Sequence, residues 1–504
     1  MERIAIIDLG SNTARLLIVD VKENGHFYVV DQLKEAPRLG EGVDKDGFLK
    51  PARIHDTINT LKMFRKLCDV NGIERVLAVA TAAVRHSKNQ RSFLDEVSAT
   101  CGIKLKVLSP EEEALLVYRG VINTMDIPKG LILEIGGGST KIIYYNRRNL
   151  LNFETLPFGA ITLTERFSAE GLSPKEIAKK IEEFFTSELE KIEWLKTVDP
   201  EVQMIGVGGS FRNLCRMTKI MKKYPLKTIH NYVINENDFD HVYDLLKGLD
   251  LDRKKKIKGL SSGRADILPS ALAATSAFKK FMKLGNIVIS GSGLRTGLLF
   301  NHAMPTTVDK PISDVLTYSL NSLVDFYDCN AKHVEHVVAL SIQLFKQLRV
   351  LHKFPRQYLK ILKVAAYLYE SGKRVGFYNF EKHSSYIISN ANIYGISHRD
   401  MVMASFVASS TGIDDINLYE WARYKELVGD EDMDAVRKMG IMLKIASSLD
   451  RSLSSIITNI NCDILGDSVI MKTEVEGDAT LEINSALQVG ADFRKQFKKN
   501  LEIL

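Results

Sequence analysis

Cysteine is scarce in this sequence: the five cysteines among 504 residues lie far apart, and no two of them form a CxxC pair. That number and spacing predict neither a disulfide framework nor a cysteine zinc site. Long apolar runs are also missing, because no stretch approaches the roughly 20 apolar residues of a membrane-spanning helix. The opening segment MERIAIIDLGS is broken at Asp8 and lacks the apolar core of a signal peptide. We therefore expect a soluble, cytoplasmic protein without a membrane partner.

A strong excess of one charge is lacking as well. Lys and Arg number 68 and Asp and Glu number 62, which leaves a net charge of +6. This mild excess suits anionic partners but falls short of a dedicated nucleic-acid binder, so no specific nucleic-acid partner is expected. With 45% hydrophobic residues and only 12 prolines, the composition is that of an ordinary folded protein. At about 150 residues per domain, the length predicts roughly three domains.

What is present first is a duplicated hairpin. Residues 3–7 and 14–21 are apolar and surround the polar turn DLGSNT, which predicts two buried strands joined by a loop. Residues 131–145 (LILEIGGGSTKIIYY) repeat that order of strand, acid, glycine turn, small hydroxyls and strand. The sequence therefore predicts an internal duplication.

The remaining patterns predict α/β organisation followed by helices. Strand patterns at 76–80 and 103–108 alternate with helical ones, and 204–211 and 287–300 each run strand, glycine turn, helix. Prolines after His302 indicate a linker, and beyond it helical periodicity predicts an α-bundle. The segments INCDIL, SVIMKTEV and ATLEIN then predict strands of a small α+β piece. The expected domains are 1–125, 126–303, 312–460 and 461–504.

Four glycine turns follow apolar strands. Glycine lets backbone N–H groups converge on phosphate oxygens, and neighbouring hydroxyls add donors. A single such turn is more often an ordinary hairpin turn, but four of them, two with an acid two residues before the first glycine, favour a phosphate-binding cleft. The candidate phosphate-binding residues in three of these turns are Gly10, Ser11, Asn12, Gly136, Gly137, Gly138, Ser139, Thr140, Gly208, Gly209 and Ser210; the fourth turn is 291–293.

Seven segments within residues 6–299 carry a family resemblance. They are DLGSNTARLLI, VATAAVR, LSPEEEALLVYRGV, LILEIGGGSTK, GVGGSFRNL, GRADILPSAL and ISGSGLRTGLL. Together they resemble the exopolyphosphatase and guanosine pentaphosphate phosphohydrolase family; related actin-like kinases and chaperones lack the EEEA and GLRTG segments. The resemblance implies two actin-like (ribonuclease H-like) α/β domains, followed by an α-helical HD-like domain and a small α+β C-terminal piece. It also implies inorganic polyphosphate, and guanosine pentaphosphate or tetraphosphate, as partners, with a homodimer as the expected assembly.

The resemblance also assigns roles within the cleft. Glu113, the last Glu before Ala in EEEA, matches the family's general base, while the same Glu run is also a helix-start charge that suits the helix dipole. Arg15, Arg85 and Arg295 match basic positions that meet the anionic chain, although a lone arginine is ordinarily a surface residue.

Asp8 and Glu134 are the candidate metal ligands. They face each other across the cleft if the two hairpins are pseudo-symmetric, and paired carboxylates suit Mg²⁺ or Mn²⁺. Two departures weaken this expectation: family members commonly have Asp where this chain has Glu134, and Glu where it has Lys141. Lys141 is expected either to contact a phosphate or to be solvated at a strand edge.

The helical unit departs from an active HD site. Such a site needs a His-Asp pair in its second segment, where this chain has Tyr369-Glu370, so metal binding there is expected to be lost. His333, His336 and His383 are then expected to pack or to contact phosphate. We expect the bundle to extend the binding channel.

Three functions remain open from the sequence. The leading hypothesis is processive hydrolysis of the terminal phosphate of inorganic polyphosphate, with guanosine pentaphosphate as a further substrate. A second is a degenerate family member that binds polyphosphate or the guanosine phosphates as a sensor. A third is an actin-like sugar or acetate kinase, in which the EEEA segment has no role.

Overall fold

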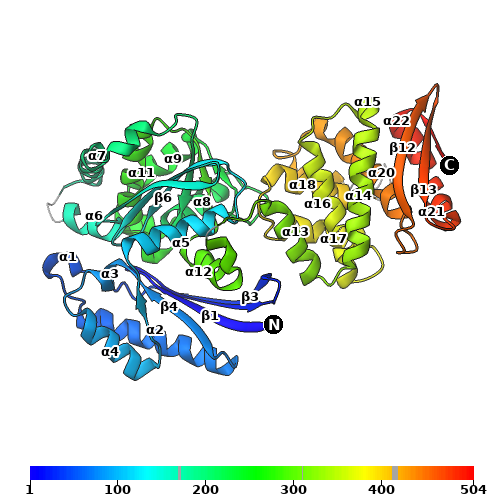
Figure 1. The fold of residues 1–504 in the computed structure, drawn as a ribbon. Helices are drawn as coiled ribbons and strands as arrows, with labels where there is room; N and C mark the ends of the chain where they lie inside the picture. Colours follow the sequence, from blue (N-terminus) through cyan, green and yellow to red (C-terminus); the bar gives the residue numbers. More distant parts are fainter. Residues whose placement is uncertain (169–171, 309, 411–417) are drawn as a thin grey trace. The chain divides into compact units, whose positions relative to one another are not determined.

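The computed structural model describes residues 1–168, 172–308, 310–410 and 418–504 (Figure 1). The chain divides into two compact units: unit 1 comprises Met1–Tyr224 and Ile229–Val315, and unit 2 comprises Pro225–Thr228 and Leu316–Leu504. Within the described residues, no helix combines the length and apolar character needed to cross a bilayer.

Five strands form the first sheet of unit 1, in the order β3-β2-β1-β4-β5. The predicted hairpin is confirmed, because β1 and β2 pair antiparallel with Asp8 opposite Arg15. β4 lies parallel to β1 on its other side, so β1 is central and its residues Ile4 to Ile7 are fully buried. The strands are β1 (Glu2–Leu9), β2 (Ala14–Val21), β3 (Phe27–Glu35), β4 (Arg75–Ala80) and β5 (Lys106–Val107). The helices that follow them are α1 (Val43–Asp46), α2 (Pro51–Val70), α3 (Ala82–Arg85), α4 (Gln90–Cys101) and α5 (Pro110–Ile122).

The second sheet of unit 1 repeats the hairpin, with six strands in the order β10-β11-β9-β6-β7-β8. β6 and β7 pair antiparallel with Glu134 opposite Lys141. In both hairpins the acid before the turn thus faces a cation on the returning strand. The strands are β6 (Lys129–Ile135), β7 (Thr140–Asn146), β8 (Asn149–Leu156), β9 (Gln203–Val207), β10 (Val233–Ile234) and β11 (Ile287–Ile289). The α-helices are α6 (Ala160–Ser168), α7 (Pro174–Glu190), α8 (Gly208–Met221), α9 (Glu236–Lys247), α10 (Leu251–Lys255), α11 (Leu268–Met282) and α12 (Leu294–Ala303). Short 3₁₀ turns are η1 (Glu193–Thr197), η2 (Ser262–Arg264) and η3 (Pro305–Val308).

Two helices of unit 1 each pack on the sheet of the other half. Buried side chains of α5, among them Val117, share a cluster with Ile132 of the second sheet. Leu299 of α12 packs in turn with Ile4 and Ile6 of the first sheet. The two helices also contact each other (Figure 1). Each helix thus belongs by sequence to one of the expected domains, 1–125 for α5 and 126–303 for α12, and packs on the sheet of the other.

Unit 2 is a helical bundle followed by a small sheet. Helices α14, α16, α18 and α20 pack on one another, and β12 packs on α14. The helices are α13 (Val315–Phe326), α14 (Ala331–Gln347), α15 (Arg349–His352), α16 (Tyr358–Leu368), η4 (Ser371–Arg374), α17 (Phe380–Asn390), α18 (His398–Ser409), α19 (Leu418–Tyr424), α20 (Asp430–Ser448), α21 (Thr480–Leu487) and α22 (Gly490–Phe497). The strands β12 (Ile457–Leu465), β13 (Ser468–Val475) and β14 (Asn500–Ile503) form a sheet in that order.

One predicted strand of unit 2 is wrong. ATLEIN lies in helix α21 instead, where Asp478 accepts hydrogen bonds from the backbone N–H and hydroxyl of Thr480 at the start of the helix. The buried positions Glu482 and Ala486 are four residues apart, which is helical spacing. The Glu482 carboxylate accepts a hydrogen bond from the Ser452 backbone N–H, so a polar residue holds a core position that the alternation pattern treats as exposed.

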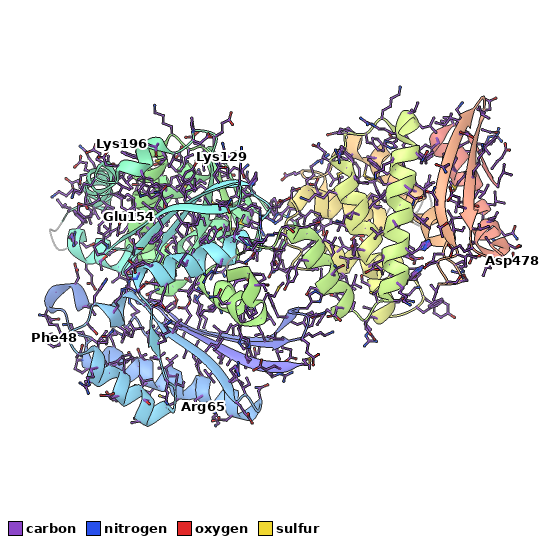
Figure 2. The ribbon with its side chains drawn as sticks, in the orientation of Figure 1. Phe48, Arg65, Lys129, Glu154, Lys196 and Asp478 are labelled. Carbon is purple, nitrogen blue, oxygen red and sulfur yellow. The ribbon has the colours of Figure 1, made fainter. Side chains whose placement is uncertain are left out.

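Several charged side chains on the surface of unit 1 form ion pairs. Lys196 and Lys129 are labelled in Figure 2. Lys196 lies 2.8 Å from Glu193, and Lys129 lies 2.5 Å from Asp199. Pairs of this exposed kind typically contribute at most about 1 kcal/mol to stability.

Candidate active site

The glycine turns of unit 1 converge on one pocket with a solvent-accessible volume of about 110 Å³. These turns follow β1, β6, β9 and β11, whose carboxyl ends meet at this place. A Cβ at Gly209 would lie 2.3 Å from Arg264 Nη2, so a side chain at this position would displace the Arg264 guanidinium. The predicted residues that line the pocket are Asp8, Gly10, Ser11, Asn12, Arg15, Glu113, Glu134, Gly136, Gly137, Gly138, Ser139, Gly208, Gly209 and Arg295.

Two predicted phosphate-binding hydroxyls lie outside the pocket lining. Thr140 donates its hydroxyl to the Phe158 carbonyl at 2.9 Å, and Ser210 donates to the Ile135 carbonyl at 3.2 Å. The reason at Thr140 is strand alternation: Ser139 and Lys141 line the pocket, so the residue between them points to the other face. Both hydroxyls therefore donate to backbone carbonyls instead of pointing into the pocket.

The three-glutamate run at the start of α5 divides into separate roles. Ser109 caps the helix by accepting from the Glu112 backbone N–H, and the Glu112 carboxylate accepts from the Ser109 backbone N–H in return. Glu111 accepts a hydrogen bond from the Ser109 hydroxyl. Glu113 is 2% exposed and lines the pocket. Glu111 and Glu112 therefore stabilise the start of the helix, while Glu113 is placed as the candidate base.

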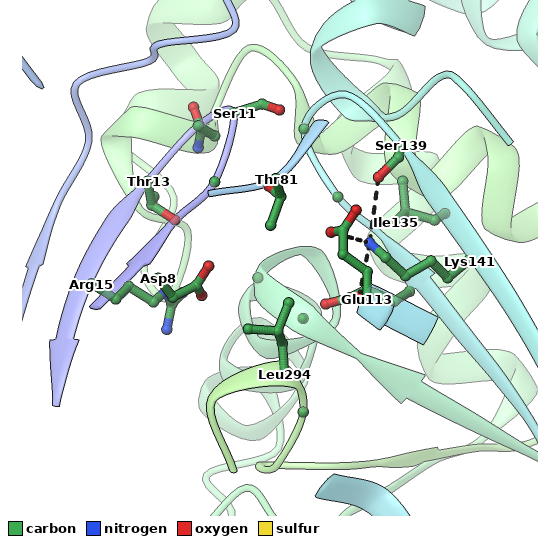
Figure 3. Close-up of a pocket in the computed structure, with 18 of the residues that line it drawn as sticks. Asp8, Ser11, Thr13, Arg15, Thr81, Glu113, Ile135, Ser139, Lys141 and Leu294 are labelled. Carbon is green, nitrogen blue, oxygen red and sulfur yellow. Dashed lines mark hydrogen bonds and ion pairs between the residues drawn. The ribbon is translucent and has the colours of Figure 1, made fainter. Parts of the chain in front are cut away.

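Two cations hold the Glu113 carboxylate. Arg85 Nη1 lies 2.6 Å from Oε2 and also donates to the Leu108 carbonyl at 2.7 Å. Lys141 Nζ lies 3.1 Å from Oε1 (Figure 3). Arg85 is absent from the pocket lining, so the structure places this predicted phosphate ligand behind Glu113 instead.

Lys141 is enclosed at the side of the pocket. Its ammonium lies 3.4 Å from Glu134 Oε2 and donates to the Ser139 hydroxyl at 3.3 Å. Only 3% of the residue is exposed, so the solvated alternative is wrong. Burial alone would lower the pKa of Lys141, but the charges of Glu113 and Glu134 raise it above its usual value.

Four arginines add positive charge to the same pocket: Arg15, Arg212, Arg264 and Arg295. Burial, followed by the charge of Arg15, lowers the pKa of both Arg264 and Arg295 to about 10. The Nε and Nη1 groups of Arg264 are buried without a hydrogen-bond partner among the described residues. Buried donors and mutually repelling cations of this kind are stabilised by an anion.

Sequence reasoning missed Arg212 and Arg264 as site residues. Both lie in segments that carry the family resemblance, GVGGSFRNL and GRADILPSAL, so the signal was their place in those motifs. The positive region also continues past the lining: partial burial and the charges of Arg15, Arg264, Arg216 and Arg212 lower the pKa of Lys34 to about 8.

The residues around Glu134 do not fit the expected divalent ion. Asp8 and Glu134 both line the pocket, as predicted for metal ligands. Mg²⁺ demands near-octahedral oxygen coordination, whereas a buried ammonium already lies against the Glu134 carboxylate. Within the described residues, no group of three or more His, Cys, Asp and Glu side chains is placed to hold a metal. The metal site therefore stays a prediction that this donor set does not favour.

The predicted histidine positions of unit 2 serve different contacts. His333 Nδ1 lies 2.6 Å from Asp450 Oδ2, and its Nε2 lies 2.6 Å from the Tyr369 hydroxyl. Both ring nitrogens are thus engaged, which agrees with the expected packing role. His336 lines a shallow depression, and His383 lies on α17 beside Gly372. The proposed kinship with HD domains stays a prediction.

Comparison with known proteins agrees with this geometry. Residues 18–305 match the Ppx/GppA phosphatase family, and residues 315–488 match Ppx/GppA phosphatase, domain III. A guanosine-5'-triphosphate,3'-diphosphate pyrophosphatase of Pseudoalteromonas translucida is 26% identical over 409 residues, which cover 79% of this chain and 78% of the relative. The corresponding protein of Vibrio vulnificus is 24% identical over 413 residues, covering 80% and 79%.

Solved structures resemble about three fifths of this chain. An exopolyphosphatase from Cytophaga hutchinsonii has a TM-score of 0.57 at 27% identity, covering 61% of this chain and 99% of its own. An Aquifex aeolicus Ppx/GppA family member has a TM-score of 0.51 at 28% identity, covering 60% and 98%. The predicted actin-like, ribonuclease H-like fold is confirmed. The family model matches more than half of this chain, and Glu113 lies in a pocket lined by cations. The chain therefore belongs to the Ppx/GppA phosphatases and is a phosphoanhydride hydrolase.

Proposed function

We propose that the protein removes the terminal phosphate from inorganic polyphosphate. The observation that carries this proposal is the chemistry of the pocket lining. Glycine turns, small hydroxyls and five cationic side chains line the pocket together with Glu113. Phosphate oxygens need donors and cations of this kind, and hydrolysis needs an acceptor for the proton of water.

Polyphosphate is favoured over guanosine pentaphosphate by what lines the pocket. Among the described residues that line it, none is aromatic, so a guanine base finds no ring there on which to stack. Lys34 and Arg216 lie near Arg15 but outside the pocket lining, and a positive region larger than the pocket suits a longer polyanion. Relatives named as guanosine pentaphosphate enzymes support the second substrate at 24–26% identity.

In the proposed reaction, water attacks the terminal phosphorus and the bridging P–O bond breaks. The proton of water passes to the Glu113 carboxylate, and the bridging oxygen leaves with the shortened chain as a phosphate anion. The arginines of the pocket balance the charge on the non-bridging oxygens. Arg85 positions the base, since it contacts Glu113 and not the pocket.

The test compares phosphate release from long-chain polyphosphate, guanosine pentaphosphate and ATP by the purified full chain. We expect the largest kcat/KM with polyphosphate, and release without any acceptor, which contradicts a kinase. Glu113→Gln is the control for background release. Tight polyphosphate binding with no turnover above that control would support the sensor hypothesis and overturn the proposal. A larger kcat/KM for guanosine pentaphosphate would reverse the order of the two substrates.

A further inference from the structure

The duplicated hairpins give the pocket two equivalent cations. Arg15 lies opposite Asp8 in the first hairpin, and Lys141 lies opposite Glu134 in the second. Both cations line the pocket. The fold therefore places a basic side chain at the register position where each acid would otherwise be free to bind a cation from solution.

The contacts of Lys141 are those of a bound cation. Its Nζ lies 3.1 Å from Glu113 Oε1, 3.4 Å from Glu134 Oε2 and 3.3 Å from the Ser139 hydroxyl. Carboxylate and hydroxyl oxygens are the ligands that a divalent ion takes from a protein. A second cation bound to the same oxygens would be repelled by the buried ammonium.

We propose that the Lys141 ammonium supplies the positive charge that a divalent ion would bring to this pocket, so that hydrolysis does not require a metal bound at Glu134. The inference rests on the proposed phosphoanhydride hydrolysis. Arg85 contacts Oε2 of Glu113 and Lys141 contacts Oε1, and Lys141 also lines the pocket. The covalent step is unchanged: water attacks, Glu113 takes the proton, and the bridging oxygen leaves.

Metal binding can be tested without any substrate. Mn²⁺ is titrated into the full chain after chelation and gel filtration, and free Mn²⁺ is followed by electron paramagnetic resonance. We expect the parent to bind no Mn²⁺ in the micromolar range. Lys141→Glu adds a third carboxylate beside Glu113 and Glu134, so we expect this variant to bind Mn²⁺ at least ~10-fold more tightly than the parent. Lys106→Glu is the matched control, because Lys106 is exposed and pairs with Glu112 outside the pocket. Micromolar binding by the parent at one ion per chain would overturn the proposal.

Turnover gives the second measurement. With polyphosphate in excess chelator, we expect the parent to keep its rate within about threefold of the rate in Mg²⁺, and Lys141→Met to lose ~10² in chelator. A parent rate that disappears in chelator and returns with Mg²⁺ contradicts the proposal, as does a Lys141→Met rate equal to that of the parent. If Lys141→Met does not fold, Lys141→Arg keeps the charge and must remain insensitive to chelator. Absence of phosphate release under every condition would refute the proposed function, while the Mn²⁺ titration would still test the role of Lys141.

Discussion

Neighbouring residues of one motif have different surroundings in this pocket. Ser139 and Lys141 line it, while Thr140 between them bonds the Phe158 carbonyl. Glu112 caps α5, and the next residue, Glu113, meets two cations. A motif match therefore locates the site, and the direction of each side chain determines its role.

Glu113→Gln is expected to lower turnover by ~10² or more, because the amide keeps the shape of the side chain and cannot accept the proton of water. Polyphosphate binding should change little, since the pocket cations remain. Steady-state phosphate release and equilibrium binding of polyphosphate measure the two effects. Glu112→Gln is the control on the same helix turn. Turnover within threefold of the parent would remove Glu113 as the base.

Arg85→Gln separates a positioning role from phosphate binding. Because Arg85 contacts Glu113 and the Leu108 carbonyl but not the pocket, we expect kcat to fall about 10-fold with KM nearly unchanged. Arg65→Gln, at an exposed pair with Asp69, serves as the control. A raised KM with unchanged kcat would instead assign Arg85 to the phosphate chain, as its sequence position suggested.

At the residue level, sequence patterns located the acids and most of the turns. Asp8, Glu113 and Glu134 all line the pocket, because each stands at a fixed place beside a strand end or helix start. Arg212 and Arg264 were not singled out, since the chain has 68 Lys and Arg residues and only tertiary packing shows which of them converge.

Among the secondary-structure elements, the crossing of α5 and α12 sets the distance between the two halves of the pocket. Glu113 lies in the first turn of α5, and Arg295 lies in the first turn of α12. The helices approach so closely that a Cβ on Gly297 would lie 2.0 Å from the Leu116 carbonyl oxygen. Any larger residue must move one helix against the other.

Gly297→Ala is accordingly expected to destabilise unit 1 by about 1–3 kcal/mol, the usual cost of overpacking, and to raise KM for polyphosphate. Thermal unfolding and steady-state kinetics measure these effects. Gly285→Ala is the matched control, because no atom lies within 4 Å of a Cβ there. A Gly297→Ala protein that melts together with the parent would show that the crossing tolerates the added methyl group.

The His333 network is expected to make the stability of unit 2 depend on pH. Burial alone would lower the pKa of His333, but hydrogen bonds to Asp450 and Glu370 raise it to about 9. Because the pKa of His333 is raised in the folded state, protonation of this residue stabilises the fold fully below the ordinary pKa of 6.5. This stabilisation is lost as the pH rises through 9. The loss amounts to at most about 3 kcal/mol.

Thermal unfolding between pH 6 and 9.5 tests this expectation. The parent should lose stability across that window, and His333→Gln should show a shallower slope because it cannot bind the proton. Tyr369, Lys373 and His336 lie near the same network, so the difference between the two proteins, rather than either curve, is the measurement. Equal slopes would mean that another group titrates.

Local periodicity predicted both hairpins and the helical bundle because their patterns repeat over short stretches of chain. It could not reveal that α5 and α12 exchange sheets, because that choice depends on apolar faces far apart in the sequence. The same limit explains the wrong prediction for ATLEIN. Its apolar residues alternate as in a strand, but the segment lies in a helix whose buried side chains are Glu482 and Ala486.

At the scale of the whole molecule, the question is whether unit 2 contributes to substrate binding. The match to the Cytophaga hutchinsonii exopolyphosphatase structure covers 99% of that chain but only 61% of this one, so part of this chain has no counterpart in the match. Deletion of residues 316–504 is therefore expected to leave short substrates nearly unaffected and to raise KM for long polyphosphate by about 10-fold, as loss of contacts beyond the reacting end predicts. Kinetics over a series of chain lengths measure this. If the truncated protein folds and treats all lengths as the parent does, unit 2 has no part in binding.

The exchange of helices in unit 1 also constrains the order in which the chain can fold during synthesis. Ile4 and Ile6 leave the ribosome long before Leu299, which packs against them and follows only when unit 1 is almost complete. Until then the first sheet presents an apolar face to the cell, and a nascent chain in that condition is prone to aggregate. Burial of this face must therefore wait for α12, so slow translation late in unit 1 would prolong the exposure, and chaperones that bind apolar strands would find their target in the first sheet.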